Sequence, residues 1–205
     1  MPASIVPLWD ERYAAPGFFF GEAPNAFLKS QAHRLQPGQS VLAVADGEGR
    51  NGVWLAEQGL QVHALDASPV ALDKSRALAL RRQVDMQWTQ ADLQTWDWPV
   101  ATHDAIVAIF IQFVGPEGRA RQFAGMRQAL KPGGLLILQG YTPRQLEYGT
   151  GGPPNVENMY TGKLLRAAFG EWEIQHLSEH DAVIEEGAGH SGMSALIDLV
   201  ARKPG

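Results

Sequence analysis

From about Ser40 onward, short apolar or β-branched runs alternate with longer stretches whose apolar residues recur at helical spacing. The short runs predict strands at 40–45, 61–65, 86–90, 104–109, 135–139, 172–178 and 194–202. The longer stretches predict helices at 51–58, 70–83, 116–130 and 161–169. Strands that alternate with helices are typical of parallel βαβ units. The pattern therefore predicts an α/β fold built on a parallel sheet.

Capping and turn residues support these boundaries. Gly59 follows the first predicted helix, where a left-handed residue commonly ends a helix. Ser68 and Pro69 are suited to the N-cap and first position of the second helix. The sequence Lys131-Pro132-Gly133-Gly134 predicts a turn that separates the helix at 116–130 from the next strand.

Residues 1–39 precede this alternating pattern. They contain a helical stretch from Pro24 to Leu35 and a group of aromatic residues: Trp9, Tyr13, Phe18, Phe19 and Phe20. One interpretation is a lid over a ligand site, and the other is an amphipathic helix packed on the edge of the sheet. No Ser/Gly-rich linker divides the chain, so we expect one structural domain composed of a segment at 1–39 and a core at 40–205.

Composition narrows the functional classes. The 205-residue chain has no cysteine, which excludes thiolate metal sites and a cysteine nucleophile. Its net charge of -5 gives no overall attraction to a phosphate backbone, so nucleic acid is not an expected partner. The first residues do not resemble a secretion signal and the longest apolar run, 105–111, is too short to span a membrane. The cytoplasm is the default expectation, and the oligomeric state is open.

Residues directly after the predicted strands carry the candidate chemistry, because ligands bind at the carboxyl ends of strands in open parallel sheets. Gly47 and Gly49 allow a sharp turn and a close approach to a ligand after the first strand. Asp66, after the second strand, is placed to accept hydrogen bonds from ribose hydroxyls. Asp92 follows the third strand and suits an adenine amino group. Each residue alone is also compatible with a tight turn or a helix cap, but their order favours a nucleoside-containing cofactor.

Apolar residues beside these groups are suited to a purine. Leu93 follows Asp92, while Ile109 and Phe110 end the fourth strand. They would pack against the two faces of the base.

Two cofactors fit the glycine-rich turn. Residues 47–52 satisfy the dinucleotide fingerprint G-x-G-x-x-G, which by itself is a weak signal. Asp46 and Glu48, however, place negative charge where a pyrophosphate would lie, and the chain has no second domain for a substrate. S-adenosylmethionine carries a sulfonium and an ammonium, so the acidic turn favours it over a nicotinamide cofactor.

Four motifs resemble those of class I S-adenosylmethionine-dependent methyltransferases. They are the segments 41–51 (VLAVADGEGRN), 64–69 (ALDASP), 91–93 (ADL) and 130–134 (LKPGG). The segments 9–13 (WDERY) and 145–153 (QLEYGTGGP), together with the turn, are similar to the bacterial branch related to tellurite-resistance methyltransferases. The resemblance covers nearly the whole chain.

This resemblance implies a single-domain Rossmann-like fold with a seven-stranded, mostly parallel sheet whose last strand is antiparallel, with helices on both faces. It implies S-adenosylmethionine as the cofactor, with the methionine moiety over the turn. The expected cofactor-binding residues are Tyr13, Phe20, Ala45, Asp46, Gly47, Gly49, Arg50, Asn51, Asp66, Ala67, Ser68, Asp92, Leu93 and Ile109. The family usually has an acidic residue at the position of Ala43 and a glycine at the position of Ala45. Asp46 is a candidate to replace the missing acid.

The expected reaction is methyl transfer to a small acceptor such as a thiol or a chalcogen oxyanion. Because the sulfonium methyl is already activated, positioning and exclusion of water are the main requirements, and no catalytic residue is assigned with certainty. Acceptor-pocket candidates are Arg50, Gln112, Tyr148 and His190. Arg50 would pair with an anionic acceptor or neutralise Asp46 or Glu48. His190 would accept a proton or lie in solvent.

The glycine-rich stretch 149–152 lies in the loop 142–155, which is a candidate to close over the substrate. No histidine spacing indicates a metal site. Two other functions remain compatible with the sequence: an NAD(P)-binding Rossmann oxidoreductase, and a non-catalytic nucleoside-binding or regulatory module that has lost cofactor contacts.

Overall fold

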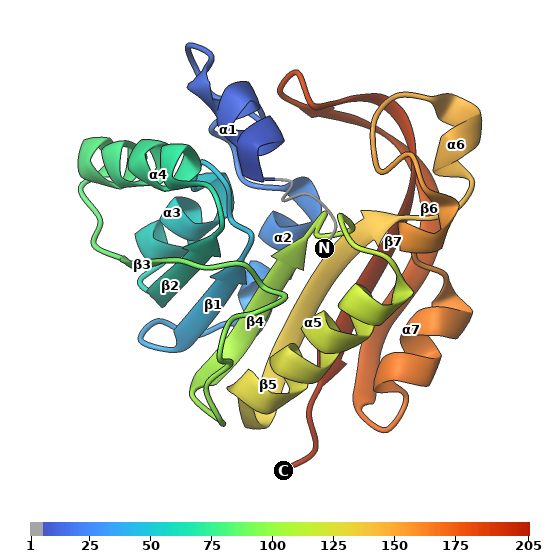
Figure 1. Cartoon of the computed structure of the whole chain (residues 1–205). Coiled ribbons are helices and arrows are strands. Elements are labelled where there is room, and N and C mark those ends of the chain that lie inside the picture. The colour runs from blue at the N-terminus through green and yellow to red at the C-terminus, as the bar shows by residue number, and fades with distance from the viewer. Residues whose placement is uncertain (1–5) are drawn as a thin grey trace.

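The computed structural model describes residues 6–205 and contains one seven-stranded sheet in the order β3-β2-β1-β4-β5-β7-β6 (Figure 1). The strands β1 (Ser40–Val44), β2 (Gln61–Asp66), β3 (Gln87–Gln90), β4 (His103–Ile109) and β5 (Leu130–Tyr141) pair in parallel. The strand β7 (His190–Arg202) pairs antiparallel with β5 and with β6 (Glu173–Glu186). The predicted mostly parallel sheet with an antiparallel last strand is confirmed.

Helices cover both faces of this sheet and create two apolar cores. On one face, α5 (Pro116–Ala129) and α7 (Gly162–Phe169) contribute Phe123, Met126 and Leu165. On the other, α2 (Ala26–Gln31), α3 (Arg50–Glu57) and α4 (Pro69–Arg82) contribute Leu28 and Leu55 among others. The central strands are buried on both sides, which explains their continuous apolar runs.

Several helix ends are formed by the residues expected for them. Ser68 caps α4 by accepting a hydrogen bond from the Ala71 amide at 3.1 Å, and Pro69 occupies the first helical position. Gly59 is left-handed, with φ of +81°. Thr161 caps α7 through the Leu164 amide.

The amino-terminal segment differs from the prediction. A helix α1 (Val6–Ala14) was not expected, and the predicted helix 24–35 is shorter: α2 begins at Ala26 and passes into a 3-10 turn at Ala32–Arg34. The start is set by Asn25, whose Oδ1 accepts a hydrogen bond from the Leu28 amide and leaves Pro24 outside the helix. Residues 1–5 of the predicted segment lie outside the described residues.

The predicted turn at 131–134 lies within β5, which was wrongly expected to begin only at 135. His103 pairs with Leu130 and Ala105 with Leu135, so the four residues form an irregularity in a continuous strand. Gly133, with φ of +73°, donates its amide hydrogen to the carbonyl oxygen of Lys203. The strand is therefore bulged and not broken.

The last two strands are longer than predicted and extend beyond the sheet as a hairpin. Pairing continues from Glu173↔Arg202 to Glu186↔His190. The outer half of β6 has many charged residues and resembles a solvated loop in sequence, so this part of the strand was not predicted. A four-residue helix α6 (Gln145–Tyr148) and a 3-10 turn (Val156–Asn158) complete the chain, and no helix among residues 6–205 is long and apolar enough to cross a membrane.

Candidate active site

The loop between β1 and α3 forms a tight turn at the carboxyl edge of the sheet. Ala45, Gly47 and Gly49 all have left-handed backbones, with φ of +49°, +59° and +90°. Ala45 has the conformation that favours glycine, which gives the family's usual glycine at this position a physical reason. A side chain at Gly47 would meet the Tyr13 hydroxyl at 3.0 Å, so this glycine leaves room for the tyrosine.

Asp46 lies buried at this turn. Its Oδ1 and Oδ2 accept a hydrogen bond from the Gly52 amide at 3.0 and 3.2 Å, so its carboxylate caps the first turn of α3. A pyrophosphate would need that helix end, which makes the turn unsuited to a dinucleotide. Burial raises the pKa of Asp46 to about 8, and a bound cation would favour its charged form.

Asp66 follows β2 and faces the same turn. Its Oδ2 accepts a hydrogen bond from the Gly47 amide at 2.8 Å, and its Oδ1 accepts one from the Ser68 amide at 2.9 Å. Burial raises the pKa of Asp66, whereas these backbone donors oppose the shift. The carboxylate is therefore fixed in orientation, with lone pairs left on both oxygens for a ligand.

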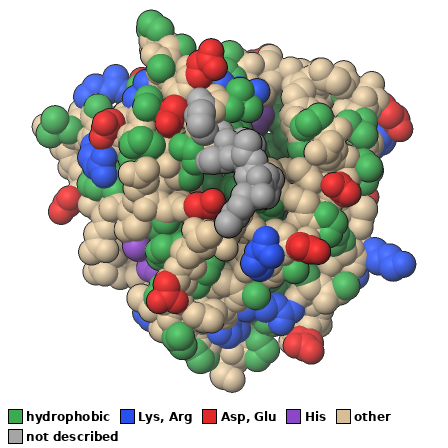
Figure 2. Space-filling view, in the orientation of Figure 1, with side chains coloured by type: hydrophobic (Ala, Val, Ile, Leu, Met, Phe, Trp, Pro, Cys, Tyr) green, Lys and Arg blue, Asp and Glu red, His purple; other side chains and the backbone are tan. Residues whose placement is uncertain are grey.

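A cavity of about 1210 Å³ opens beside these carboxylates. Figure 2 shows the hollow on this face of the molecule, with hydrophobic side chains inside it. Single ligand pockets have volumes of roughly 300–1,000 Å³, so the cavity has room for a nucleoside cofactor and a small acceptor together. The cavity therefore suits a two-ligand reaction.

Thirteen of the fourteen residues expected to bind the cofactor line this cavity. They are Tyr13, Phe20, Ala45, Asp46, Gly47, Arg50, Asn51, Asp66, Ala67, Ser68, Asp92, Leu93 and Ile109. Gly49 does not line it. A side chain at Gly49 would lie 2.3 Å from Ser75 Oγ, so this glycine serves the close packing of α3 against α4.

Glu48 also lies apart from the cavity lining. Its Oε1 pairs with Lys74 Nζ at 2.9 Å and its Oε2 accepts a hydrogen bond from the Phe19 amide at 2.7 Å. Lys74 thus neutralises the charge of Glu48. The hydrogen bond from the Phe19 amide to Glu48 holds the amino-terminal segment in place. Of the two acids that favoured a cationic cofactor, only Asp46 faces the ligand space.

Aromatic side chains form the upper part of the cavity, which we call the roof: Trp9, Tyr13, Phe20, Phe110 and His190. Trp9 and Tyr13 come from α1 and stack with ring centroids 5.6 Å apart. The His190 ring lies between Phe20 and Phe110, at 4.4 and 4.3 Å. The carbonyl of Phe19 accepts a hydrogen bond from the Ala188 amide at 2.8 Å, which joins the amino-terminal segment to the tip of the hairpin.

Phe110 has a strained backbone, with φ of +56° directly after β4. Its amide donates to the carbonyl of Gln139 at 2.8 Å, and its ring also stacks on Tyr141 at 4.7 Å. A left-handed conformation is costly for a bulky residue and is kept where the surroundings require it. The strain places the Phe110 ring against His190 in the cavity wall.

Of the four acceptor-pocket candidates, Arg50 and His190 line the cavity, while Gln112 and Tyr148 do not. Gln112 is buried behind β5, where its Nε2 donates to the Tyr141 carbonyl at 2.8 Å. Tyr148 lies beside Arg144, whose guanidinium carbon is 5.6 Å from the tyrosine ring. The structure therefore gives both residues positions outside the predicted pocket, because side chains on α6 and after β4 turn toward neighbouring strands.

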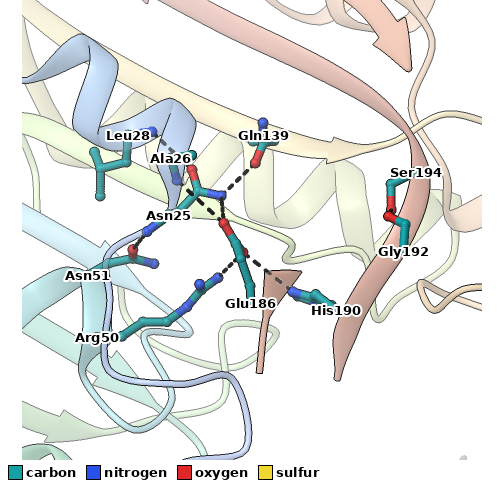
Figure 3. A network of polar contacts seen from close by, with 10 residues as sticks. All are labelled: Asn25, Ala26, Leu28, Arg50, Asn51, Gln139, Glu186, His190, Gly192 and Ser194. Atoms are coloured by element: carbon teal, nitrogen blue, oxygen red, sulfur yellow. Dashed lines mark hydrogen bonds and ion pairs between the residues drawn. The ribbon is translucent and has the colours of Figure 1, made fainter. Parts of the chain in front are cut away.

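Glu186 joins the two acceptor candidates and was not identified from the sequence. Its Oε2 lies 2.6 Å from Arg50 Nη2 and 3.7 Å from His190 Nδ1 (Figure 3). Arg50 thus pairs with Glu186 and with neither Asp46 nor Glu48. Glu186 occurs in the acidic run 185–186, which resembles a solvated surface. The one sequence feature that could have identified Glu186 is that an acid and a histidine flank Gly187-Ala188-Gly189.

No group of three or more His, Asp or Glu side chains within residues 6–205 could hold a metal ion. Outside the roof, His180 Nε2 pairs with Asp198 Oδ2 at 2.7 Å.

Comparison with known proteins was made with both sequence and structure. Residues 41–134 match a family model described as a methyltransferase domain. A glycine/sarcosine N-methyltransferase from Parasynechococcus marenigrum is 30% identical over 160 residues, which are 76% of this chain and 54% of that protein. A thiopurine S-methyltransferase from Pseudomonas putida is 28% identical over 222 residues, 95% of this chain and 96% of that protein. This chain thus spans about half of the first relative and nearly all of the second.

The fold has a close counterpart among solved structures. TehB from Haemophilus influenzae superposes with a TM-score of 0.73 at 16% identity, over 98% of this chain and 68% of that chain. This likeness supports the fold.

Proposed function

Because this chain belongs to the class I S-adenosylmethionine-dependent methyltransferases, with S-adenosylmethionine as its cofactor, we propose that it methylates a small-molecule acceptor such as a thiol or a chalcogen oxyanion. The thiopurine S-methyltransferase that matches along nearly its whole length supports a sulfur acceptor. The tellurite-resistance-like branch stays a prediction from sequence motifs.

The observation that carries the proposal is the pair of buried carboxylates on one cavity wall. Asp46 and Asp66 come from neighbouring strands, are both under 10% exposed and both line the cavity. A cationic cofactor with a ribose matches them, because Asp46 would face the positive charges and Asp66 the ribose hydroxyls. The residues present therefore fit the family's cofactor, even though position 43 holds alanine where the family usually has an acidic residue.

When bound, the cofactor supplies an activated methyl group on a sulfonium. The chain's residues do the rest: the turn and the two carboxylates hold one ligand, the roof excludes water, and Arg50 and His190 stand at the acceptor end. We also propose that the segment 1–39 acts as a lid, since its residues Trp9, Tyr13 and Phe20 contribute to the roof. The loop 142–155 does not contribute lining residues to the cavity, so its closure over substrate has no support here.

Calorimetry with S-adenosylmethionine tests the cofactor site. We expect Asp92→Asn to weaken binding by about 1 kcal/mol, since the neutral amide oxygen accepts a weaker hydrogen bond from an amino group than a carboxylate does. Asp92 is exposed, and among residues 6–205 its side chain accepts a hydrogen bond only from the nearby Gln94 amide, so the fold should tolerate the change. Asp97→Asn, on an exposed neighbour outside the cavity lining, is the matched control. Absence of binding by the unmodified chain at millimolar cofactor would refute the proposed function.

A screen of acceptors tests the second half of the proposal. Small thiols, selenite, tellurite, phenols and amines would each be incubated with cofactor, and release of the demethylated cofactor would be followed. Turnover with thiols or chalcogen oxyanions is expected. Turnover with amines alone would contradict the proposed acceptor class.

A further inference from the structure

Two residues of the cavity wall, a histidine and a guanidinium, meet a carboxylate that lies behind them, and the three come from three elements. His190 begins β7, Glu186 ends β6 and Arg50 begins α3, and their side chains are each about a tenth exposed or less. The hairpin turn at 187–189 brings Glu186 and His190 opposite one another in the register. Three polar groups therefore meet beside the largely apolar roof.

Glu186 is held firmly in one orientation. Its Oε1 accepts a hydrogen bond from Asn25 Nδ2 at 2.9 Å, and its Oε2 accepts one from Arg50 Nη2 at 2.6 Å. Asn25 is itself fixed, because its Nδ2 also donates to Gln139 Oε1 at 2.6 Å while its Oδ1 caps α2. Figure 3 shows these contacts converging on the Glu186 carboxylate. Although burial opposes ionisation, His190 and Arg50 lower the pKa of Glu186 to about 2, so it is an anion at neutral pH.

The orientation of the His190 ring follows from this anion. Nδ1 faces Glu186 at 3.7 Å and has no hydrogen-bond partner among the described residues. An anion on that side favours the tautomer with its proton on Nδ1. Nε2 lies on the edge of the ring opposite Nδ1, and unlike Nδ1 it is not among the fully buried unpartnered atoms of the described residues; since His190 lines the cavity, Nε2 is the ring nitrogen open to the ligand space. Burial lowers the pKa of His190, and Arg50 adds to this while Glu186 opposes it, which keeps the ring neutral near pH 7.

We propose that His190 is the general base that deprotonates the acceptor, with Glu186 as the residue that positions its ring. This inference rests on the proposed function and adds that the acceptor is a thiol that enters protonated. The S–H bond of the acceptor breaks, an N–H bond forms at Nε2, and the electron pair stays on sulfur to bond with the methyl carbon. The carbon–sulfonium bond breaks with its electrons going to the cofactor sulfur, and the proton passes from His190 to solvent after turnover.

Two thiols that differ in acidity separate a base from a structural residue. The nitro group of 4-nitrothiophenol makes it an anion at neutral pH, whereas benzyl mercaptan remains protonated. We expect His190→Gln to lose about 10²–10⁴-fold in kcat/KM with benzyl mercaptan, the usual range for a general base. The loss with 4-nitrothiophenol should stay within a few-fold. Equal losses with both thiols, or none with either, would overturn the base role.

The positioning role has its own pair of variants. Glu186→Gln keeps the shape but removes the anion, and we expect it to reduce turnover of benzyl mercaptan more than that of 4-nitrothiophenol. Glu185→Gln is the matched control, because that residue is adjacent on β6 and exposed. His33→Gln, on an exposed histidine far along the chain, controls for loss of an imidazole.

A measurement independent of turnover completes the test. Nitrogen NMR of histidine-labelled protein should show His190 as a neutral ring with its proton on Nδ1, and this preference should be lost in Glu186→Gln. A ring with its proton on Nε2 would overturn the proposal even if neither thiol is methylated. Calorimetry distinguishes failure of the general-base proposal from failure of the proposed function. A chain that binds the cofactor but has the wrong His190 tautomer refutes only the general-base role of His190. A chain that binds no cofactor refutes the proposed function.

Discussion

Asp46 is a buried acid whose protonation should be coupled to cofactor binding. Its carboxyl has a pKa of about 8 in the free chain, so it is mostly protonated at pH 7, and a sulfonium ligand would stabilise its anion. We therefore predict release of close to one proton on binding at pH 7, with affinity falling as the pH drops below about 8. Calorimetry in two buffers of different ionisation enthalpy would measure the release.

The Asp46→Asn variant is the control for this coupling, since it cannot ionise but keeps an oxygen for the Gly52 amide. It should show the same binding enthalpy in both buffers. An unmodified chain whose enthalpy does not depend on the buffer would contradict the prediction.

Ala45 shows a second effect of a single residue, because its left-handed backbone is strained. Such a conformation costs an L residue roughly 1–2 kcal/mol, and glycine avoids the cost while losing somewhat more entropy on folding. We predict that Ala45→Gly raises the free energy of unfolding by about 0.5–1 kcal/mol. Ala43→Gly, two residues earlier in the regular strand β1, should instead lower it by about 1 kcal/mol. Urea denaturation would measure the free energy of unfolding of both variants. If Ala45→Gly is less stable than the unmodified chain, the backbone of Ala45 is not strained.

At the scale of elements, the hairpin β6–β7 depends on glycines where it meets the amino-terminal segment. A side chain at Gly187 would lie 2.3 Å from the backbone oxygen of Phe19, in addition to the strain of φ of +68°. We predict that Gly187→Ala separates the tip from the segment, so that amide exchange accelerates at residues 17–22 and 184–192. Exchange in β1 and α3 should not change.

Gly133→Ala is the matched control for this prediction. Gly133 has a similar φ of +73° in the β5 bulge, but no atom of the described residues beyond its chain neighbours lies within 4 Å of an added Cβ. If the control accelerates exchange at the same residues as Gly187→Ala, the contact with Phe19 is not what holds the tip.

These elements also show where sequence reasoning succeeded and where it failed. The parallel strands and their helices were predictable because both faces of the sheet are covered, which produces continuous apolar runs and recognisable caps such as Ser68. Asp66 and Asp46 were found because the carboxyl ends of parallel strands share one edge. The outer half of the hairpin was missed because an exposed strand has no apolar run. Glu186 was missed for the same reason, and also because its role depends on contacts with Arg50 and Asn25, which are 136 and 161 positions away in the sequence.

For the molecule as a whole, a buried histidine far from the cavity should make folding sensitive to acid. His103 is 5% exposed, neither ring nitrogen has a hydrogen-bond partner among the described residues, and burial lowers its pKa to about 4. The unfolded chain binds a proton at this residue below about pH 6.5 while the folded chain does not, so stability falls as the pH drops from 6.5 toward 4.

The variant His103→Phe tests this prediction, because phenylalanine fills the buried site of His103 and cannot be protonated. Between pH 7 and pH 5 it should lose about 2 kcal/mol less stability than the unmodified chain, measured by urea denaturation at each pH. His33→Gln, at an exposed position, should leave the difference unchanged. Identical pH dependence in His103→Phe would show that other groups govern acid unfolding.

Because the hairpin tip packs on residues 19–21, the cavity has two walls that come from different parts of the chain. The consecutive strand ends form a floor that recognises one ligand, whereas the roof, except for Phe110 after β4, comes from α1, the residues that follow it and the hairpin. Evolution or an engineer can therefore alter the length and side chains of the roof while the floor keeps its cofactor. The chain is a modular scaffold on which a new acceptor preference requires changes to two short surface segments and none to the parallel strands β1 to β5.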